Sequence, residues 1–375
     1  MAKSIYEKGN ARRYFAEDIF EQNTNSITYI IGDETMKKSI LVTGGAGYIG
    51  SHTVVELLEE GYDPIIVDNL VNASEESIKR VEKITGKKPT FYNADLRDRA
   101  ALEKIFRAHD IEAVIHFAGL KAVGESVQMP LEYYDNNIGG TLVLLEVMRE
   151  KNVKKLIFSS SATVYGDPER LPIDEECRLS TTNPYGSTKL FIEYILKDLC
   201  KADASWNITL LRYFNPVGAH PSGLIGEDPK GIPNNLTPYI AKVAAGKLEC
   251  INVFGNDYPT PDGTGVRDYI HVLDLAHGHL LALQKVTTTG IHIYNLGTGK
   301  GYSVLDMIHA FEKACGKKLP YKICPRRSGD IATCYAKADK AEKELGFKAT
   351  RGIDEMCDSM WKWQSMNPDG YGVRK

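Results

Sequence analysis

The sequence predicts an α/β protein with a doubly wound parallel sheet and a smaller C-terminal α/β domain. From residue 37 to about residue 215, short apolar runs typical of buried parallel strands alternate with stretches of helical periodicity. A glycine-rich turn joins the first of these strands to the first helix. After residue 216, a stretch rich in Gly, Pro and Asn ends the regular alternation. We therefore expect about two domains in the 375 residues.

The elements of the first part follow from their patterns in chain order. Apolar runs predict buried strands at 40–43, 64–67, 90–95, 113–117, 155–159 and 208–212. Helical periodicity predicts helices at 49–60, 75–84, 100–108, 131–150 and from 183 to about 200. Since helical stretches separate the strands, we expect the strands to lie parallel with helices on both faces.

The turn between the first strand and the first helix contains Gly44, Gly47 and Gly50. Such glycines let the backbone approach a pyrophosphate, and the helix N-terminus offers free N–H groups to it. Asp68 ends the second strand, 18 residues after Gly50, where a carboxylate can bind the ribose diol of adenosine and repel a 2′-phosphate. This Rossmann-type arrangement favours NAD over NADP, the alternative being a glycine-rich turn that binds nothing.

The pattern also indicates the division of the chain. We expect residues 37–215 to form the NAD-binding domain and residues 216–375 to form a substrate-binding domain, with some segments of the second interleaved with the first. Residues 1–36 form a polar N-terminal extension that lacks the apolar region of a signal peptide. We interpret it as disordered or as lying upstream of a natural start at Met36, with a short strand at 27–31.

Composition excludes several classes of function. The net charge of −3 implies no basic face for nucleic acid. No apolar run approaches the length of a membrane span. The seven cysteines are scattered, without a C-x-x-C pair, which favours reduced thiols in the cytoplasm over a disulfide framework or a zinc site. His271, His277 and His279 have no carboxylate or cysteine at ligand spacing, so we expect no metal.

Tyr185 and Lys189 are four residues apart and should lie on one face of a helix. A neighbouring ammonium would favour the phenolate and lower the pKa of the tyrosine, which would make it a proton acceptor near neutral pH. Alone, this spacing more often marks a solvated helix face. The glycine turn upstream changes the balance in favour of catalysis.

Ser161 follows the strand at 155–159, at the edge of the sheet where catalytic groups gather. Its hydroxyl could bind a substrate alcohol and pass the proton to Tyr185. A serine triplet is more often a loop cap, but the presence of Tyr185, Lys189 and the glycine turn favours a catalytic role.

This combination resembles the extended short-chain dehydrogenase/reductase family, which acts largely on nucleotide sugars. Within it, the chain is most similar to the UDP-hexose 4-epimerases, over about residues 37 to 371. The stretches that carry this resemblance are 116–126, 136–137, 211–223, 226–229 and 262–272.

The resemblance implies an isomerase that interconverts UDP-galactose and UDP-glucose. Hydride would pass reversibly from C4 of the sugar to a tightly bound NAD, through a 4-keto intermediate. Tyr185 would remove the 4′-hydroxyl proton, Ser161 would orient that hydroxyl, and Lys189 would hold the nicotinamide ribose while lowering the pKa of Tyr185.

The resemblance also implies two sets of binding residues. Those for NAD are Gly44, Gly47, Tyr48, Ile49, Gly50, Asp68, Asn69, Asp95, Leu96, Phe117, Lys121, Asn136, Tyr185, Lys189 and Tyr213. Those for the UDP-sugar are Ser161, Tyr185, Asn215, Asn235, Leu236, Asn252, Phe254, Arg267, Arg327, Asp330 and Cys334. Arg267 and Arg327 also suit a diphosphate, which guanidinium binds bidentately, although a single arginine is more often a surface ion pair.

Two further expectations concern substrates and partners. Cys334 stands where the related enzymes line the sugar pocket, and a small residue there would leave room for an acetamido group, so UDP-GlcNAc and UDP-GalNAc are expected substrates. The family implies a homodimer. The helix after Asn183 has apolar residues on more than one side, which fits either a partner subunit or a second layer of its own domain.

Two alternatives stay open. One is another NAD-dependent nucleotide-sugar oxidoreductase or dehydratase. The related 4,6-dehydratases have two acidic side chains where this chain has Ala162 and Thr163, which argues against the dehydratase. The other is a non-catalytic NAD-binding protein on the same fold.

Overall fold

The computed structural model describes residues 38–231, 233–327 and 330–372. The N-terminal extension and the strand expected at 27–31 lie outside the described residues.

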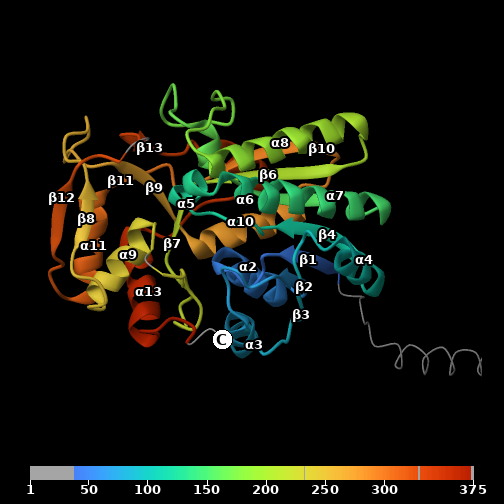
Figure 1. Ribbon diagram of the computed structural model, residues 1–375, viewed down its shortest axis with the longest axis horizontal. Helices are drawn as coiled ribbons and strands as arrows, with labels where there is room; N and C mark the ends of the chain where they lie inside the picture. Colours follow the sequence, from blue (N-terminus) through green and yellow to red (C-terminus); the bar gives the residue numbers. More distant parts are fainter. Residues whose placement is uncertain (1–37, 232, 328–329, 373–375) are drawn as a thin grey trace, which may run out of the picture. The chain divides into compact units, whose positions relative to one another are not determined.

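A seven-stranded, wholly parallel sheet forms the centre of the first part, in the order β10-β6-β5-β4-β1-β2-β3 (Figure 1). Its strands are β1 (Ser39–Thr43), β2 (Asp63–Asp68), β3 (Thr90–Asn93), β4 (Ile111–His116), β5 (Lys155–Ser161), β6 (Asn207–Tyr213) and β10 (Gly290–Leu296). The chain adds β2 and β3 on one side of β1, and β4, β5 and β6 on the other. This reversal between β1 and β4 is the switch point at which such sheets bind ligands beyond the carboxyl ends of their strands.

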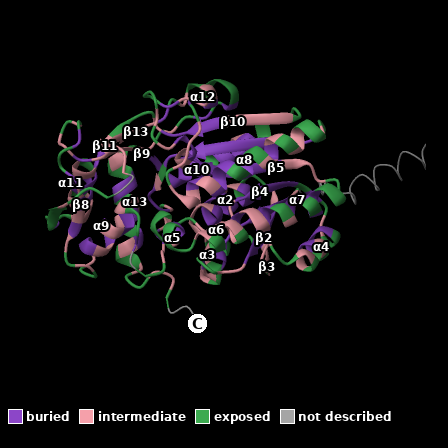
Figure 2. Cartoon of the chain, turned by 45° about the horizontal axis from the view of Figure 1, so that its top comes forward, coloured by how far each residue is buried: buried purple, intermediate pink, exposed green. Residues whose placement is uncertain are grey.

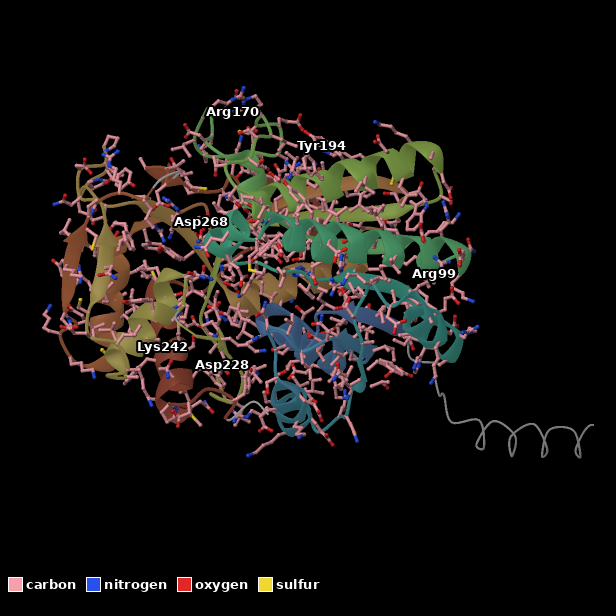
Figure 3. The ribbon with its side chains drawn as sticks, in the orientation of Figure 1. Arg99, Arg170, Tyr194, Asp228, Lys242 and Asp268 are labelled. Atoms are coloured by element: carbon pink, nitrogen blue, oxygen red, sulfur yellow. The ribbon has the colours of Figure 1, made fainter. Side chains whose placement is uncertain are left out.

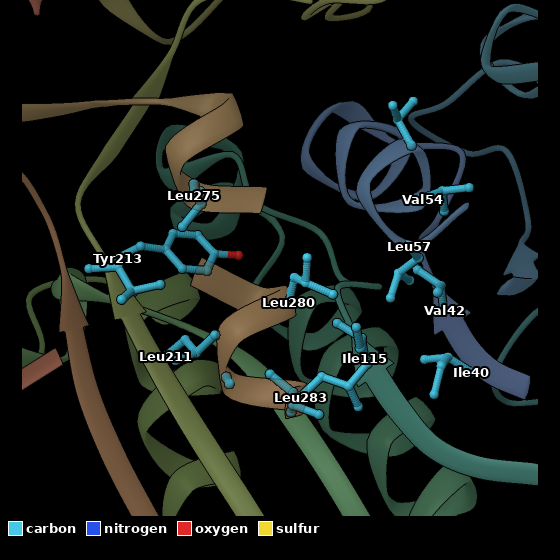
Figure 4. Close-up of a cluster of buried hydrophobic side chains, with 14 of the residues drawn as sticks. Ile40, Val42, Val54, Leu57, Ile115, Leu211, Tyr213, Leu275, Leu280 and Leu283 are labelled. Carbon is cyan, nitrogen blue, oxygen red and sulfur yellow. The ribbon is translucent and has the colours of Figure 1, made fainter. Parts of the chain in front are cut away.

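Helices cover both faces of this sheet, as the alternation predicts. One face packs against α2 (Tyr48–Glu59), α3 (Glu75–Thr85) and α10 (Val272–Lys285), and Figure 4 shows Val54, Leu57, Leu275, Leu280 and Leu283 of α2 and α10 among this core. The other face packs against α4 (Arg99–Ala108), α7 (Gly140–Glu150) and α8 (Pro184–Ala202). Figure 2 shows the central strands as the most deeply buried part. The two-sided burial explains why these strands are apolar throughout.

The helix expected at 131–150 forms, with a π-helical turn in its middle that the periodicity did not predict. The chain forms α6 (Pro130–Tyr134), then a π-helical turn η1 (Asp135–Gly139), then α7. Within η1, the buried Asn137 accepts a hydrogen bond from the Leu120 backbone N–H at 2.8 Å and donates one to Thr188 at 3.0 Å. These bonds hold an amide inside the core, and the widened turn accommodates it.

The seventh strand, β10, and helix α10 come from beyond residue 216 and complete the first sheet and one of its helical layers. They are segments of the kind expected to interleave. The boundary near residue 215 itself stays a prediction.

The remaining elements build the second part. Strand β9 (Val266–His271) pairs with β11 (Gly301–Ser303), with β13 (Thr333–Cys334) and with β7 (Asn215–Val217). A separate pair joins β8 (Ile251–Phe254) to β12 (Tyr321–Cys324). The helices are α9 (Leu236–Ala244), α11 (Val304–Cys315) and α13 (Ile353–Met366), whereas α12 (Asp339–Leu345) packs on α10 and β10 of the first part. Two short elements in the first part, α5 (Val123–Gln128) and the 3₁₀ turn η2 (Ala162–Tyr165), lie beside α8.

Candidate active site

The turn between β1 and α2 leaves no room for side chains. Gly44 has a φ of +71°, and a Cβ there would lie 2.7 Å from the backbone nitrogen of Ala118. A Cβ on Gly50 would lie 2.3 Å from the carbonyl oxygen of Gly44. Helix α2 begins directly after Gly47, without a side-chain cap among the described residues. A bare helix N-terminus beside a close-packed glycine turn fits the pyrophosphate of a dinucleotide.

Asp68 lies beside this turn at the end of β2. Its carboxylate accepts hydrogen bonds from the backbone N–H groups of Ala46 at 3.1 Å and Leu70 at 2.9 Å. Burial raises the pKa of Asp68, and these two bonds oppose the rise. The next residue, Asn69, donates to Asp95 at 2.9 Å. The structure thus brings together Asp68, Asn69 and Asp95, three of the residues predicted to bind NAD.

Asp95 also has a partner that the sequence analysis did not foresee. Arg97 makes an ion pair with it at 2.8 Å and holds its pKa well below the ordinary value. The adenosine end of the site therefore keeps a charged carboxylate at neutral pH.

The other predicted cofactor residues lie around the carboxyl ends of the central strands. Phe117 follows β4, and Tyr213 is the last residue of β6. Both rings contact the ring of His279 on α10, at centroid distances of 4.6 Å for Phe117 and 5.7 Å for Tyr213. Lys121 makes an ion pair with Glu227 at 3.0 Å. The side chain of Asn136 donates a hydrogen bond to the side chain of the buried Asn137 at 2.9 Å.

Ser161 and Tyr185 meet at the carboxyl edge of the sheet. Ser161 is the last residue of β5, and its Oγ accepts a hydrogen bond from the Thr163 N–H at 3.2 Å. Tyr185 lies in the first turn of α8, which Asn183 caps by accepting from the Gly186 N–H at 2.8 Å. Burial raises the pKa of the Tyr185 phenol, and a smaller contribution from the Ser161 side chain opposes the rise. The predicted serine and tyrosine therefore lie close enough to influence one another.

Lys189 lies one helical turn beyond Tyr185, as the spacing predicts. The contacts of its ammonium group are with other residues than Tyr185. Its Nζ donates to the carbonyl oxygen of Ser159 at 2.7 Å and lies 4.9 Å from the centroid of the Phe158 ring. Burial lowers the pKa of Lys189 to about 8. In this arrangement Lys189 is not among the groups that shift the pKa of Tyr185, and the expectation that it lowers that pKa stays a prediction. Burial raises the pKa of Tyr185, and the bond from Ser161 is what opposes the rise.

A buried hydrogen-bond network that the sequence analysis missed fixes the catalytic helix. His116 bridges Thr43 on β1 at 2.7 Å and Thr141 on α7 at 2.9 Å. Asn137 continues it to Thr188 on α8, between Tyr185 and Lys189 in sequence. Burial lowers the pKa of His116 to about 3, so its ring is neutral. The one available signal was the presence of His116 in an otherwise apolar run.

The predicted UDP-sugar residues fall into two groups in the second part. In the first, the Arg327 guanidinium stacks 4.7 Å from the Phe254 ring centroid and pairs with Asp330 at 2.9 Å. Asn252 lies on the same strand as Phe254 and accepts from Cys324 at 3.7 Å. Asn235 and Leu236 begin α9, and Asn215 begins β7 with its side chain exposed. This group supplies one cation and one aromatic face.

The second group pairs Arg267 on β9 with Cys334 on β13, at matched positions of neighbouring strands. Asp268, labelled in Figure 3, holds this strand pair through bonds from the N–H groups of Ala336 at 3.1 Å and Thr298 at 2.9 Å. Cys334 packs on the cluster that includes Val164, which lies within the turn η2 that follows Ser161. Cys334 therefore shares a packing cluster with the catalytic end of β5.

Comparison with known proteins places this arrangement among nucleotide-sugar enzymes. A family model described as GDP-mannose 4,6 dehydratase matches residues 41–360. UDP-glucose 4-epimerase of Bacillus subtilis is 64% identical over 334 residues, which cover 89% of this chain and 98% of that protein. The human UDP-glucose 4-epimerase is 58% identical over 347 residues, covering 90% of this chain and all of that protein.

A solved structure extends the similarity to the fold. The crystal structure of UDP-glucose 4-epimerase from Bifidobacterium longum, in complex with NAD⁺ and UDP, is 62% identical with a TM-score of 0.87, and the match covers 89% of this chain and 100% of that one.

Proposed function

This chain belongs to the family of UDP-glucose 4-epimerases, and we propose that it interconverts UDP-galactose and UDP-glucose through a 4-keto sugar. It is an isomerase that uses NAD. When bound, NAD takes the hydride from C4 of the hexose and returns it to the opposite face of the keto sugar, so that net redox is zero. The observation that carries the proposal is the placement of Ser161 at the carboxyl end of β5, where it acts on the pKa of Tyr185 in the first turn of α8.

The residues around β1 fit NAD. The turn at Gly44 and Gly50 packs closely against backbone and admits no Cβ, and α2 begins directly after Gly47 without a side-chain cap, which leaves its first N–H groups for a pyrophosphate. Asp68 is held by two backbone N–H groups beside the turn, where it can accept from a ribose diol. We assign the remaining NAD contacts to Tyr48, Ile49, Asn69, Asp95, Leu96, Phe117, Lys121, Asn136, Lys189 and Tyr213.

Tyr185 is the proton carrier in this proposal. As phenolate, it accepts the proton of the 4′-hydroxyl at its Oη and returns a proton when the keto sugar is reduced. Ser161 stabilises the phenolate by a hydrogen bond and orients the substrate hydroxyl. Lys189 holds the nicotinamide ribose from one turn further along α8.

The UDP moiety stays anchored while the keto sugar turns over. We assign the diphosphate to the guanidinium groups of Arg267 and Arg327, which suit bidentate binding. Asn215, Asn235, Leu236, Asn252, Phe254 and Asp330 complete the proposed UDP-sugar contacts. Retention of the intermediate depends on this anchor, because the sugar itself must be free to rotate.

The test is conversion of UDP-galactose by purified protein without added NAD. We expect turnover by the wild type and nearly none by Tyr185→Phe, which keeps the ring but has no proton to exchange. Absence of wild-type turnover, even with NAD supplied, would reject the substrate assignment. A dehydratase reaction is disfavoured because neither Ala162 nor Thr163 can ionise.

The same site should accept acetamido sugars. Cys334 has a compact side chain, and burial raises the pKa of its thiol to about 11, so it is uncharged at neutral pH. Beside Arg267, it leaves room that a tyrosine would fill. We expect conversion of UDP-GlcNAc to UDP-GalNAc by the wild type. Cys334→Tyr should abolish this activity and retain that on UDP-galactose, and loss of both activities would contradict the assignment.

A second copy of the chain is the proposed partner. Apolar side chains are exposed on three adjoining helices: Leu131 (78%) on α6, Val127 (62%) on α5, and Tyr194 (45%, Figure 3) and Phe191 (44%) on α8. The opposite side of α8, with Ile192 and Leu196, faces the sheet. Phe191→Lys should convert a dimer to a monomer in light scattering, and a wild-type monomer would reject the proposal.

We also propose a cytoplasmic location, since all seven cysteines are free thiols. Among the described residues, no helix has the length and apolar character needed to cross a membrane, and no cluster of His, Cys, Asp or Glu is arranged to hold a metal ion.

A further inference from the structure

Residues 218–230, which we call the strap, follow β7 and connect three loops of the dinucleotide site. Gly218 accepts a hydrogen bond from the Tyr48 hydroxyl at 2.6 Å, at the start of α2. Glu227, almost fully buried, pairs with Lys121 at 3.0 Å. Lys230 donates to the carbonyl oxygens of Leu70, at 3.4 Å, and Val71, just beyond Asp68 and Asn69. Each of these loops contains a residue that we assign to NAD.

The C-terminal segment holds the strap from another side. The indole of Trp363, on α13, donates to the carbonyl oxygen of Glu227 at 3.1 Å. Asn367 donates to the carbonyl oxygen of Gly223 at 2.9 Å. The Tyr371 N–H donates to the carboxylate of Asp228, labelled in Figure 3, at 3.0 Å. The strap is therefore bonded to the cofactor loops and to the C-terminal segment at the same time.

One side chain joins the strap to the C-terminal segment. Arg80, on α3, donates through Nη1 to the carbonyl oxygen of Leu224 in the strap at 3.0 Å and to the Asn367 side chain at 2.6 Å. Its guanidinium lies 5.7 Å from the ring centroid of Trp363 and 5.1 Å from that of Tyr371. A planar guanidinium can donate and stack in this way, whereas an ammonium offers only a point charge.

We propose that the strap retains NAD on the glycine turn and that Arg80 is the positioning residue that fastens it. The inference rests on the proposed function, in which NAD stays bound through many turnovers. The loops with Tyr48, Asn69 and Lys121 are each tied to the strap, so opening the site on this side requires those bonds to break. Bonds from Arg80 to Leu224 and Asn367 add to the barrier that a departing NAD must cross.

The experiment compares Arg80→Met with Lys79→Met, its neighbour on α3. Lys79 is exposed and pairs with Glu75 at 3.9 Å, away from the strap, so it is a matched control for loss of one charge. NAD-loaded protein is diluted, protein-bound nucleotide is separated by gel filtration at intervals, and NAD is quantified after denaturation. We expect Arg80→Met to release NAD at least about tenfold faster, as loss of a charge-assisted hydrogen bond implies, and Lys79→Met to match the wild type.

Two further measurements separate retention from folding. With NAD in excess, kcat of Arg80→Met should return to within about twofold of the wild type, because the catalytic groups are untouched. Lys230→Met removes a different bond of the strap from an exposed position and should also release NAD faster. If Arg80→Met does not fold, Lys230→Met decides.

The outcomes distinguish the two proposals. Release at the wild-type rate by both Arg80→Met and Lys230→Met would overturn the strap. A wild-type protein that turns over UDP-galactose only while NAD is supplied would overturn cofactor retention. A wild-type protein without turnover under any condition would overturn the proposed function.

Discussion

Replacement of Ser161 by alanine tests whether the serine–tyrosine pair sets the reactivity of the site. The change removes the hydrogen bond that lowers the pKa of Tyr185, in a position where burial already raises that pKa. A hydrogen bond to a charged group is worth about 1.5–3 kcal/mol. Since about 1.4 kcal/mol is a factor of ten in rate, Ser161→Ala should lower kcat by about tenfold to about 150-fold.

The pH dependence of kcat shows the direction in which Ser161→Ala shifts the pKa of Tyr185. Below its pKa, each further unit separating the pH from that pKa lowers the phenolate fraction of Tyr185 tenfold. Without Ser161, the pKa rises by about one to two units, since one unit corresponds to about 1.4 kcal/mol. The rise of kcat with pH should therefore move to higher pH. The loss should be largest at low pH and should narrow as the pH approaches the pKa of the wild-type phenol.

The assay is the initial rate of UDP-galactose conversion across the pH range, with NAD content measured for each protein. Thr163→Val is the control, because the Thr163 hydroxyl is buried without a hydrogen-bond partner among the described residues and valine has nearly the same shape. We expect Thr163→Val to keep the wild-type profile. A loss below about twofold for Ser161→Ala at every pH would refute the reasoning, since even a neutral hydrogen bond contributes about 0.5 kcal/mol.

Three further predictions follow from buried groups and from the turn. Glu193→Gln leaves the guanidinium of Arg212, 2.6 Å away and 1% exposed, without its counter-charge. Urea unfolding should show a loss of about 3–5 kcal/mol, and an unchanged midpoint would contradict it. Because burial lowers the pKa of Lys189 to about 8, its ammonium is lost as the pH rises through that value, and this loss should offset the growing phenolate fraction of Tyr185, so that turnover levels off above it. Rates that keep rising to about pH 10, near the ordinary pKa of lysine, would contradict a role for that charge. Gly44→Ala forces a Cβ to 2.7 Å from the Ala118 nitrogen at a positive φ, so purified protein should contain at least about tenfold less NAD, and a full complement of NAD would be the opposing result.

The fold was largely predictable where burial alone decides the structure. The strands expected at 40–43, 64–67, 155–159 and 208–212 appear within two residues of their expected ends, because strands covered on both faces are apolar throughout. The helix expected at 131–150 forms, but its π-helical turn was not predicted because Asn137 bonds to a loop and to another helix, and periodicity does not register such partners. Strand β10 was not specified because its place beside β6 depends on a long-range parallel pairing.

In the site, too, the spacing of residues in the sequence predicted the shared helix, whereas the contacts of each side chain depend on the surrounding fold. The interval from Tyr185 to Lys189 correctly predicted a shared helix, but it did not determine which group the lysine would contact. In the fold, Nζ of Lys189 donates to the Ser159 carbonyl oxygen. Burial raises the pKa of Tyr185 and lowers that of Lys189, which favours the neutral form of both side chains. The proton therefore rests on the tyrosine, and stabilisation of the phenolate depends first on Ser161. Ser161 is therefore as necessary to proton transfer as Lys189, although only the lysine was indicated by its spacing from Tyr185. The acid side of the pH profile should respond to Ser161→Ala.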